Sequence, residues 1–562
     1  MISYRKLAMR VLGNSPVSAV KTARRSTAKR AAALALTAAL VVGMTLPAFA
    51  QDWYIENGDI SISAGTNGNN VTQGETTKEN DTDTVIKSSD PSTASSNTVT
   101  IDAEEGKTVN VTLDNVTINV DEGYKYGYDS NAYKTAVSVT GSGNTNIELN
   151  GNNTLTSGYG HAGLEHNKTD DSGTLTIQDE KNDDGSAKGS ASDTTGSLTA
   201  TGGYHGAGIG GSDGHDGQAT ITGGEIIANG GSLGAGIGGG AGDTDAVGGD
   251  GDVTISGGTI TATGGSLGAG IGGGAYGNGT VTITDGDITA KATGSYGAGI
   301  GGGFGAIPKD TLIGGNGTVT ISGGTITEAS GGYMAAGIGS GYQGLGKVTI
   351  EGDAVIKNAQ GGEAGAGIGS GTSGDSEIII RDNAVIENAE SSANGAGIGS
   401  GQGFYYEDDD GLRVIDSTVG NVTIEGNAKI ENAKSGSGGS GIGGGAIGIG
   451  NVIIRGNAQI GNATGGEEGA GIGGGALGTG DVTIEGNVTI ENAQGGAGAA
   501  GIGGGAETEP DTEDTRNKVS IKSTEAGSPN ITATGGGVLN DENYPLPGAA
   551  AIGSGSVADG AT

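Results

Sequence analysis

Aromatic residues lie on both sides of a recurring glycine-rich segment, and their rings could bind sugars. Residues 268–275 read GAGIGGGA, and similar segments recur along the chain. A flat ring with a phenol group packs against a sugar ring and donates a hydrogen bond. The alternative is a row of rings that only stabilises the stacking of repeats. We predict binding of carbohydrate by the aromatic residues that precede or follow these segments: Tyr204, Tyr276, Tyr296, Phe304, Tyr333, Tyr342, Tyr405 and Tyr406.

Two acidic segments are candidates for calcium binding. Carboxylates and backbone carbonyls on loops are the ligands that Ca²⁺ prefers. An acidic surface in contact with water is the alternative. If calcium is a cofactor, we expect its ligands to come from Asp243, Asp245, Asp250 and Asp252 in one segment, and from Asp408, Asp409 and Asp410 in the other.

All four histidines fall within one part of the chain: His161, His166, His205 and His215. Imidazoles beside carboxylates such as Asp213 could hold a transition metal. Four separate surface histidines in a loop-rich region are the simpler interpretation. We therefore predict no transition-metal site.

The sequence gives little support for catalysis. A glycoside hydrolase needs two carboxylates at a set separation, and no such pair is evident. A lyase would need a base and a cation, but the coils hold few arginines: Arg381, Arg413, Arg455 and Arg516. We predict that the protein is not an enzyme.

The glycine-rich segment sets the architecture that must position these residues. Its central isoleucine recurs most closely at spacings of 28 to 30 residues, as from Ile442 to Ile472 to Ile502. A fixed period of this length marks a solenoid, in which each repeat contacts its neighbours. The isoleucines stand at 209, 237, 271, 300, 338, 368, 398, 442, 472, 502 and 552.

One repeat, residues 252–274, shows how the chain turns. Val253 and Ile255 alternate with polar residues, then Ile260 and Ala262 do so, and Ile271 sits between glycines. Period-two alternation in short runs bounded by glycine predicts strands with one buried face. The sequence therefore predicts an all-β, right-handed parallel β-helix of about twelve or thirteen coils, with three short strands in each coil.

Asparagines recur at two corners of the later repeats. Their amides can hydrogen-bond to the coil above, and asparagine tolerates the left-handed turn conformation. We predict a structural role for both rows: Asp353, Asn383, Asn427, Asn457 and Asn487, then Asn358, Asn388, Asn432, Asn462 and Asn492.

The first 50 residues resemble a secretory signal peptide. They hold eight basic residues and no acidic one, followed by an apolar run and the sequence Ala-Phe-Ala. Residues 51–562 then contain 20 basic and 64 acidic side chains, a net charge of −44. Such a surface repels nucleic acid, so we predict no nucleic-acid partner. We also expect no membrane span after the signal is removed, and a secreted or cell-surface location.

The leader and the repeat pattern together divide the chain into four segments. Residues 1–50 are the signal, 51–97 a polar lead-in strand and loop that cap the solenoid, and 98–173 irregular first coils. Residues 174–562 hold the regular coils, whose extra residues mostly follow the glycine-rich segment. We expect the C-terminal end to be uncapped, so that a further subunit or a missing segment covers it.

The phrase Val-Thr-Ile-Ser-Gly-Gly-Thr-Ile-Thr, at 253–261 and 319–327, resembles the core phrase of a bacterial carbohydrate-binding family. Residues 109–118 are similar to that family too. The family was described for a secreted clostridial protein that binds cellulose and pectin-type polymers, and its fold is a right-handed parallel β-helix with calcium. Its third strand carries aspartate before Gly-Ile, where this chain has alanine, so we transfer no metal ligand: Ala207, Ala235, Ala269 and Ala298.

These observations together predict an extracellular protein that binds polysaccharide along one face without cleaving it. A passive cell-surface adhesin or stalk is the alternative, and a polysaccharide lyase or hydrolase is a further one.

Overall fold

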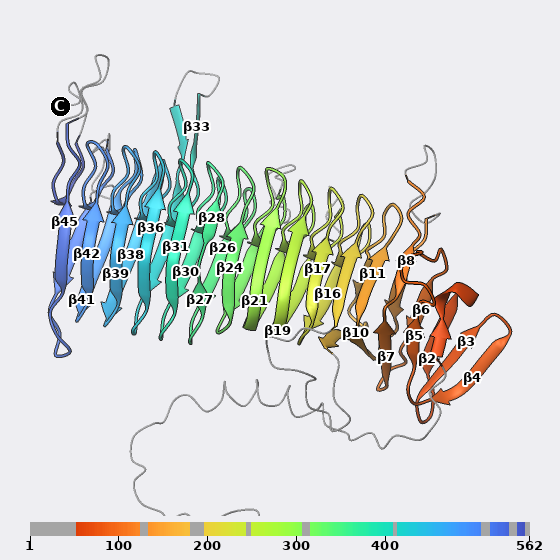
Figure 1. Cartoon of the computed structure of the whole chain (residues 1–562). Helices are drawn as coiled ribbons and strands as arrows, with labels where there is room; N and C mark the ends of the chain where they lie inside the picture. Colours follow the sequence, from red (N-terminus) through yellow and green to blue (C-terminus); the bar gives the residue numbers. More distant parts are fainter. Residues whose placement is uncertain are drawn as a thin grey trace, which may run out of the picture. The chain divides into compact units, whose positions relative to one another are not determined.

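The computed structural model describes residues 52–123, 133–179, 196–242, 249–305, 315–407, 413–506, 517–538 and 548–556. The chain divides into two compact units, and the described residues all belong to the one formed by residues 49–182 and 187–562. The predicted signal peptide lies outside the described residues. Within that unit the chain winds through a stack of coils (Figure 1).

Each coil contributes one strand to each of three parallel ladders. The first ladder, across the described residues, consists of β7 (Thr108–Asp114), β10 (Asn144–Asn150), β13 (Leu175–Asp179), β16 (Asp216–Ile221), the first half of β19 (Gly251–Gly264), the first half of β21 (Gly279–Ala292), β23 (Gly317–Ile321), β26 (Gly346–Ile350), β30 (Ser376–Ile380), β35 (Thr418–Ile424), β38 (Gly448–Gly456), β41 (Gly480–Gly486) and β44 (Lys518–Lys522).

The second ladder lies beside the first. It consists of β8 (Thr117–Asn119), β11 (Asn152–Thr156), β14 (Ser197–Thr201), β17 (Glu225–Asn229), the second halves of β19 and β21, β24 (Thr325–Ser330), β27 (Val355–Ile356) with β28 (Ala359–Gly361), β31 (Val385–Ser391), β36 (Lys429–Ser435), β39 (Gln459–Thr464), β42 (Thr489–Gln494) and β45 (Asn530–Thr534).

The third ladder contains the recurring isoleucines. It consists of β9 (Val137–Thr140), β12 (Leu164–Lys168), β15 (Ile209–Gly210), β18 (Ile237–Gly238), β20 (Ile271–Gly272), β22 (Ile300–Gly301), β25 (Ile338–Gly339), β29 (Ile368–Gly369), β32 (Ile398–Gly399), β37 (Ile442–Gly443), β40 (Ile472–Gly473), β43 (Ile502–Gly503) and β46 (Ile552–Gly553). The fold is therefore a parallel β-helix, and the described residues from β7 to β46 form thirteen coils, as the repeat predicts.

The N-terminal segment contains more strands than the predicted lead-in strand and loop. It holds β1 (Asp52–Tyr54), the short 3₁₀ helix η3 (Ile55–Asn57), β2 (Ile60–Ala64), β3 (Asn69–Gln73), β4 (Thr76–Asp81), β5 (Val85–Lys87) and β6 (Val99–Asp102). β2 and β6 extend the third ladder, whereas β3 pairs antiparallel with β2, and β4 pairs antiparallel with β3. The buried Trp53 donates from Nε1 to Asp81 Oδ2 at 3.0 Å, which fixes β1 beside this hairpin.

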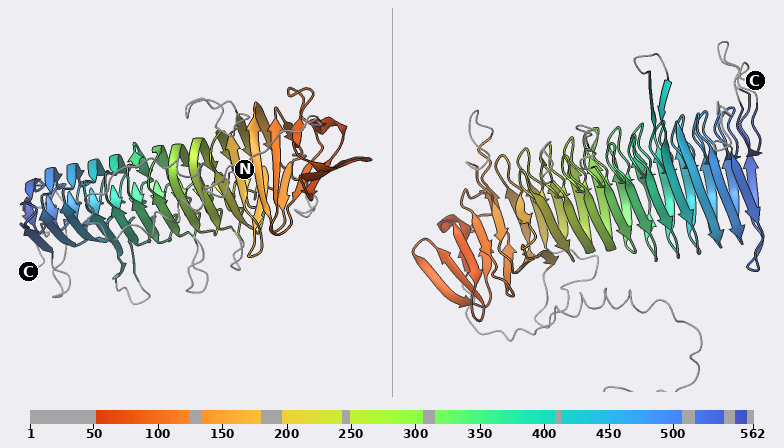
Figure 2. Two further views of the ribbon diagram at one scale, coloured as in Figure 1. Left: turned by 90° about the horizontal axis from the view of Figure 1, so that it is seen from below. Right: turned by 180° about the vertical axis from the view of Figure 1, so that it is seen from behind.

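One hairpin leaves the stack. β33 (Phe404–Glu407) and β34 (Arg413–Asp416) pair antiparallel with each other in a sheet of their own. They extend away from the coils (Figures 1 and 2). The described residues contain no helix with the length and apolar character that a membrane span requires.

The core runs along the inside of the coils. Val253, Ile255, Ile260 and Ala262 point inward and are buried, as their alternation predicts, and the isoleucines of the third ladder stack on one another. Each large aliphatic side chain that is buried in this way contributes about 1.5–3 kcal/mol. At the last described coil, Ile521 is 43% exposed.

Both asparagine rows form hydrogen-bonded ladders, as predicted. At one corner, Asn427 donates from Nδ2 to Asn383 Oδ1 at 3.2 Å, and Asn457 donates to Asn427 at 3.1 Å. At the other corner, Asn462 donates to Asn432 at 3.0 Å. Each amide bonds to the coil before it, so these rows hold the coils in register.

Charged side chains alternate along the outer face of the first ladder. The Arg381 Nε donates to Glu351 Oε2 at 2.7 Å, and the Arg455 Nε donates to Glu425 Oε2 at 2.8 Å. Arg381 and Arg455 thus pair with carboxylates of the preceding coil. These pairs link neighbouring coils through the two arginines.

Several coils hold a residue other than glycine in the left-handed conformation at the turn after the third strand. Ser373 is one of them, with φ of 56°, and its buried hydroxyl has no hydrogen-bond partner among the described residues. The others are Tyr276, Gln343, Ile447 and Leu477. This conformation costs a non-glycine residue roughly 1–2 kcal/mol, so these turns store strain.

We expect Ser373→Gly to raise the free energy of unfolding by about 1 kcal/mol. Glycine relieves the strain of the left-handed backbone and removes the unsatisfied hydroxyl. Urea unfolding monitored by circular dichroism measures the change. Ser392→Gly is the control, because Ser392 is exposed and its φ is negative. A Ser373→Gly protein less stable than wild type would contradict this account.

Candidate functional site

The predicted aromatic residues lie at the two turns that flank the third strand. The turn after the third strand bonds to the turn before it in the preceding coil, as where the Tyr342 N–H donates to the Tyr296 carbonyl at 3.1 Å. The Phe304 N–H donates in the same way to the Leu267 carbonyl. Both sets of turns therefore form one continuous edge of the β-helix. We call the rings along it the aromatic edge: Tyr133, Tyr159, Tyr204, Tyr276, Tyr296, Phe304, Tyr333 and Tyr342.

One group of rings lies in the first three coils. Tyr159 and Tyr204 stack nearly parallel, with ring centroids 5.8 Å apart, and Tyr133 continues the row at 5.5 Å from Tyr159. The His205 imidazole lies 5.0 Å from the Tyr159 ring and 5.1 Å from the Tyr204 ring. Tyr204 ends this row and is 50% exposed, so one ring remains accessible from solution.

A second group lies further along the stack. Phe304 and Tyr342 stack nearly parallel at 5.8 Å, and Tyr296 packs against both, at 4.9 and 5.6 Å. Tyr276 meets the edge of Phe304 at 5.3 Å. Four of the predicted residues are thus brought together, and each is partly exposed.

The remaining predicted rings are placed differently. Tyr333 makes no ring contact among the described residues and is 49% exposed. A hydrogen bond and the charge of Glu363 raise the pKa of the Tyr333 phenol. Tyr204 and Tyr333 each lie five residues before the isoleucine of the third strand in their coil, whereas Tyr296 lies four residues before it. The rings that precede the third strand therefore form two rows. The side chains of Tyr405 and Tyr406 lie outside the described residues.

The candidate calcium ligands do not converge within the described part of the chain. Asp250 accepts hydrogen bonds from Asn278 N at 2.7 Å and Nδ2 at 3.1 Å, and burial raises the pKa of its carboxyl. Asp252 pairs with Lys168 at 2.6 Å. The described residues contain no cluster of three or more metal-binding side chains. Asp243, Asp245, Asp408, Asp409 and Asp410 lie outside the described residues, so calcium binding stays a prediction.

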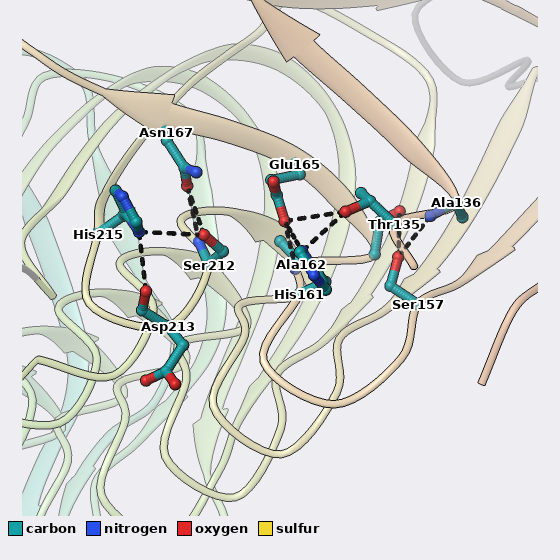
Figure 3. Close-up of polar contacts among 11 residues, drawn as sticks. Thr135, Ala136, Ser157, His161, Ala162, Glu165, Asn167, Ser212, Asp213 and His215 are labelled. Atoms are coloured by element: carbon teal, nitrogen blue, oxygen red, sulfur yellow. Dashed lines mark hydrogen bonds and ion pairs between the residues drawn. The ribbon is translucent and has the colours of Figure 1, made fainter. Parts of the chain in front are cut away.

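Two histidines pair with carboxylates in successive coils. The His161 Nδ1 lies 2.8 Å from Glu165 Oε2, which also accepts from the Ala162 N–H and the Thr135 hydroxyl at 3.3 Å (Figure 3). Burial acts to lower the pKa of His161, but the hydrogen bond and charge of Glu165 outweigh it and raise the pKa above its usual value. In the next coil, His205 Nδ1 lies 2.7 Å from Asp213 Oδ1.

The other two histidines have different surroundings. His215 is exposed, and its Nδ1 lies 2.8 Å from the Asp213 carbonyl (Figure 3). His166 is 2% exposed, its Nδ1 lies 3.1 Å from the Gln218 carbonyl, and burial lowers its pKa. The prediction of four surface histidines is therefore wrong for His166, because it takes an inward position on β12.

The strand β12 departs from the pattern of the coils that follow. It reads Leu-Glu-His-Asn-Lys where β15, β18 and β20 read Ile-Gly. Polar side chains therefore occupy positions that glycine holds elsewhere. A hollow of about 320 Å³ lies beside this strand, lined by Ser138, Thr140, Glu165, Asn167 and Asp171 among others. The sequence signal for it was the degenerate segment at 161–164, in which leucine replaces isoleucine and glutamate follows.

The comparison with protein families agrees with this geometry. The family model described as a β-helix repeat matches residues 196–213, 220–241, 253–275, 281–304 and 319–342. The chain carries β-helix repeats. The matched segments lie in coils that contribute strands to all three ladders. No curated protein and no solved structure matches this chain.

Proposed function

We propose that this β-helix protein binds polysaccharide along its aromatic edge, outside the cell, and does not cleave the polymer. One observation carries the proposal: rings of successive coils gather at one edge while Tyr204 and Tyr333 each leave about half of their surface in solution, at 50% and 49%. If these rings served only to stabilise the stacking of coils, burying them would give the largest gain in stability.

The form of the edge suits a long polymer. Coils in a β-helix stack about 4.8 Å apart, so rings in several coils offer repeated contacts along the stack. The strong negative charge of the chain favours neutral polymers over acidic ones. Sugar rings stack on aromatic faces, and phenol groups donate hydrogen bonds to their hydroxyls.

A pull-down on insoluble polysaccharides tests the proposal. Wild-type protein is expected to be retained by at least one insoluble glycan, with neutral cellulose favoured over acidic pectin and with no new reducing or unsaturated ends. Tyr204→Ala together with Tyr333→Ala is expected to weaken retention by at least about tenfold, since a stacked aromatic residue contributes on the order of 1 kcal/mol or more.

Tyr54→Ala is the matched control, because Tyr54 is 37% exposed but lies in β1, away from the aromatic edge. Equal retention of the control and the double variant would contradict a role for the edge. No retention of wild type on any glycan would favour the stalk, and new chain ends would favour an enzyme. Repeating the assay with a chelator tests the calcium prediction.

A further inference from the structure

The hollow beside β12 has two free hydrogen-bonding groups on one face. Leu164 and His166 point into the core, so the alternation of the strand places Glu165 and Asn167 together on the outer face. Both residues line the hollow, with Ser138 and Thr140 of the neighbouring strand β9. Glu165 aligns with Ser138 in the register of β12 and β9.

Glu165 offers an acceptor that is fixed in place. Its Oε2 is fully used by His161, Ala162 and Thr135. Its Oε1 accepts no hydrogen bond from the described residues. Glu165 is 7% exposed and its Oε2 is held by three hydrogen bonds, so a ligand would reach the free oxygen from the hollow.

Asn167 offers a donor beside it. The N–H of Ser212 donates at 2.8 Å and its hydroxyl at 3.1 Å to the same atom of Asn167, which must therefore be the carbonyl oxygen Oδ1 (Figure 3). The amide nitrogen Nδ2 makes no hydrogen bond within the described residues. Its two hydrogens are available to a ligand.

We propose that this hollow binds a small neutral saccharide through two adjacent hydroxyl groups. One hydroxyl donates to Glu165 Oε1, and its neighbour accepts from Asn167 Nδ2. Adjacent hydroxyls supply both roles, whereas an anionic ligand would be repelled by Glu165 and Asp171. The described lining holds no tyrosine, phenylalanine or tryptophan that could stack a base, and its volume of about 320 Å³ suits one or two sugar rings. This site is separate from the aromatic edge and does not depend on polymer binding.

The test is a titration of the full-length protein with methyl β-glucopyranoside, methyl α-mannopyranoside and methyl β-galactopyranoside, followed by saturation-transfer NMR. At least one glycoside is expected to bind saturably, with cyclohexanol showing no saturable binding. Asn167→Asp is expected to weaken this binding by at least about tenfold, because it replaces the donor with an acceptor. The variant keeps the acceptor that Ser212 needs, so its thermal unfolding should match that of wild type.

Asn421→Asp is the matched control. It adds the same charge at a position far along the stack from the hollow. It also keeps the acceptor for Asn451, which donates to Asn421 Oδ1 at 3.0 Å. Ser138→Val is a second variant, which replaces a hydroxyl of the lining with methyl groups while keeping a residue that favours strands, and it should also weaken binding.

The result of the titration is independent of the polymer assay. Asn167→Asp should leave retention on polysaccharide unchanged, and the double variant of Tyr204 and Tyr333 should leave glycoside binding unchanged. The proposal is overturned if wild type binds none of the three glycosides, or if Asn167→Asp and Ser138→Val both bind as wild type does.

Discussion

Gly301→Ala is expected to lower the free energy of unfolding by about 3 kcal/mol or more. Gly301 pairs with Gly339 of the next coil and has φ of 131°, a conformation that residues with a side chain rarely adopt. A Cβ atom there would lie 1.8 Å from the Gly339 carbonyl oxygen, which belongs to backbone and cannot turn aside. The third ladder must therefore separate at this point or distort.

Hydrogen exchange is the best measurement for this variant. A solenoid unfolds in parts, because each coil contacts its neighbours and not the rest of the chain. Protection should fall most for the amides of β22 and β25, with urea unfolding giving the overall loss.

Substitutions at two other glycines distinguish the two causes of the lost stability, which are the backbone conformation and the steric clash. Gly214 has φ of 75° but a Cβ there would meet no atom within 4 Å, so Gly214→Ala should cost only about 1 kcal/mol. Gly537 has neither constraint, and Gly537→Ala should be near neutral. A Gly301→Ala protein as stable as Gly537→Ala would show that the ladder does not require glycine.

Glu165→Gln is expected to lower the pKa of His161. Burial alone lowers this pKa, and the Glu165 carboxylate reverses the effect. Without the charge, burial is opposed only by a backbone hydrogen bond at Tyr133 and the charge of Asp213. Removing one partner of such a buried pair typically costs about 3–5 kcal/mol, so the variant should also be markedly less stable in acid. Titration of the imidazole by NMR measures the pKa directly.

The pH dependence follows from the sign of the shift. Because the pKa of His161 is raised in the folded state, its stabilising contribution is present below the unfolded pKa of about 6.5 and is lost as pH rises through the folded pKa. Wild type and Glu165→Gln should therefore differ most in acid. His166 acts in the opposite direction, since burial lowers its pKa and its contribution is lost as pH falls.

His215→Gln is the control, because His215 is exposed and lies outside this pair. An unchanged pKa of His161 in Glu165→Gln would show that Glu165 does not set it.

The coil could be predicted from the sequence because each of its signals is local. Val253 and Ile255 alternate with polar residues within one strand, and the glycines around Ile271 mark the third strand. The constant spacing then sets the register. The strands β3 and β4 were missed because most of their residues are polar: β4 reads Thr-Thr-Lys-Glu-Asn-Asp, and pairing with β3 determines its conformation. β5 was missed because its apolar run, Val-Ile, is only two residues long.

The candidate site could be predicted only in part. The aromatic rows were evident from their offsets to each isoleucine, but the offset differs by one residue between Tyr296 and Tyr333, which places them in different rows. The pairing of His161 with Glu165 joins a turn to a strand, and Thr135 joins it from the coil before. Such contacts depend on stacking across coils, which no single segment of sequence reveals.

The asparagine ladders and the third ladder share one consequence. Ile442, Ile472 and Ile502 stack at intervals of 30 residues, and Asn427, Asn457 and Asn487 bond across the same intervals. Each 30-residue repeat therefore presents the same side chains and backbone groups to the coil after it as the coil before it presents to the repeat. Recombination between neighbouring repeats can therefore delete or duplicate a whole coil in frame, and the length of the protein can change during evolution in steps of one coil while the new junction still fits.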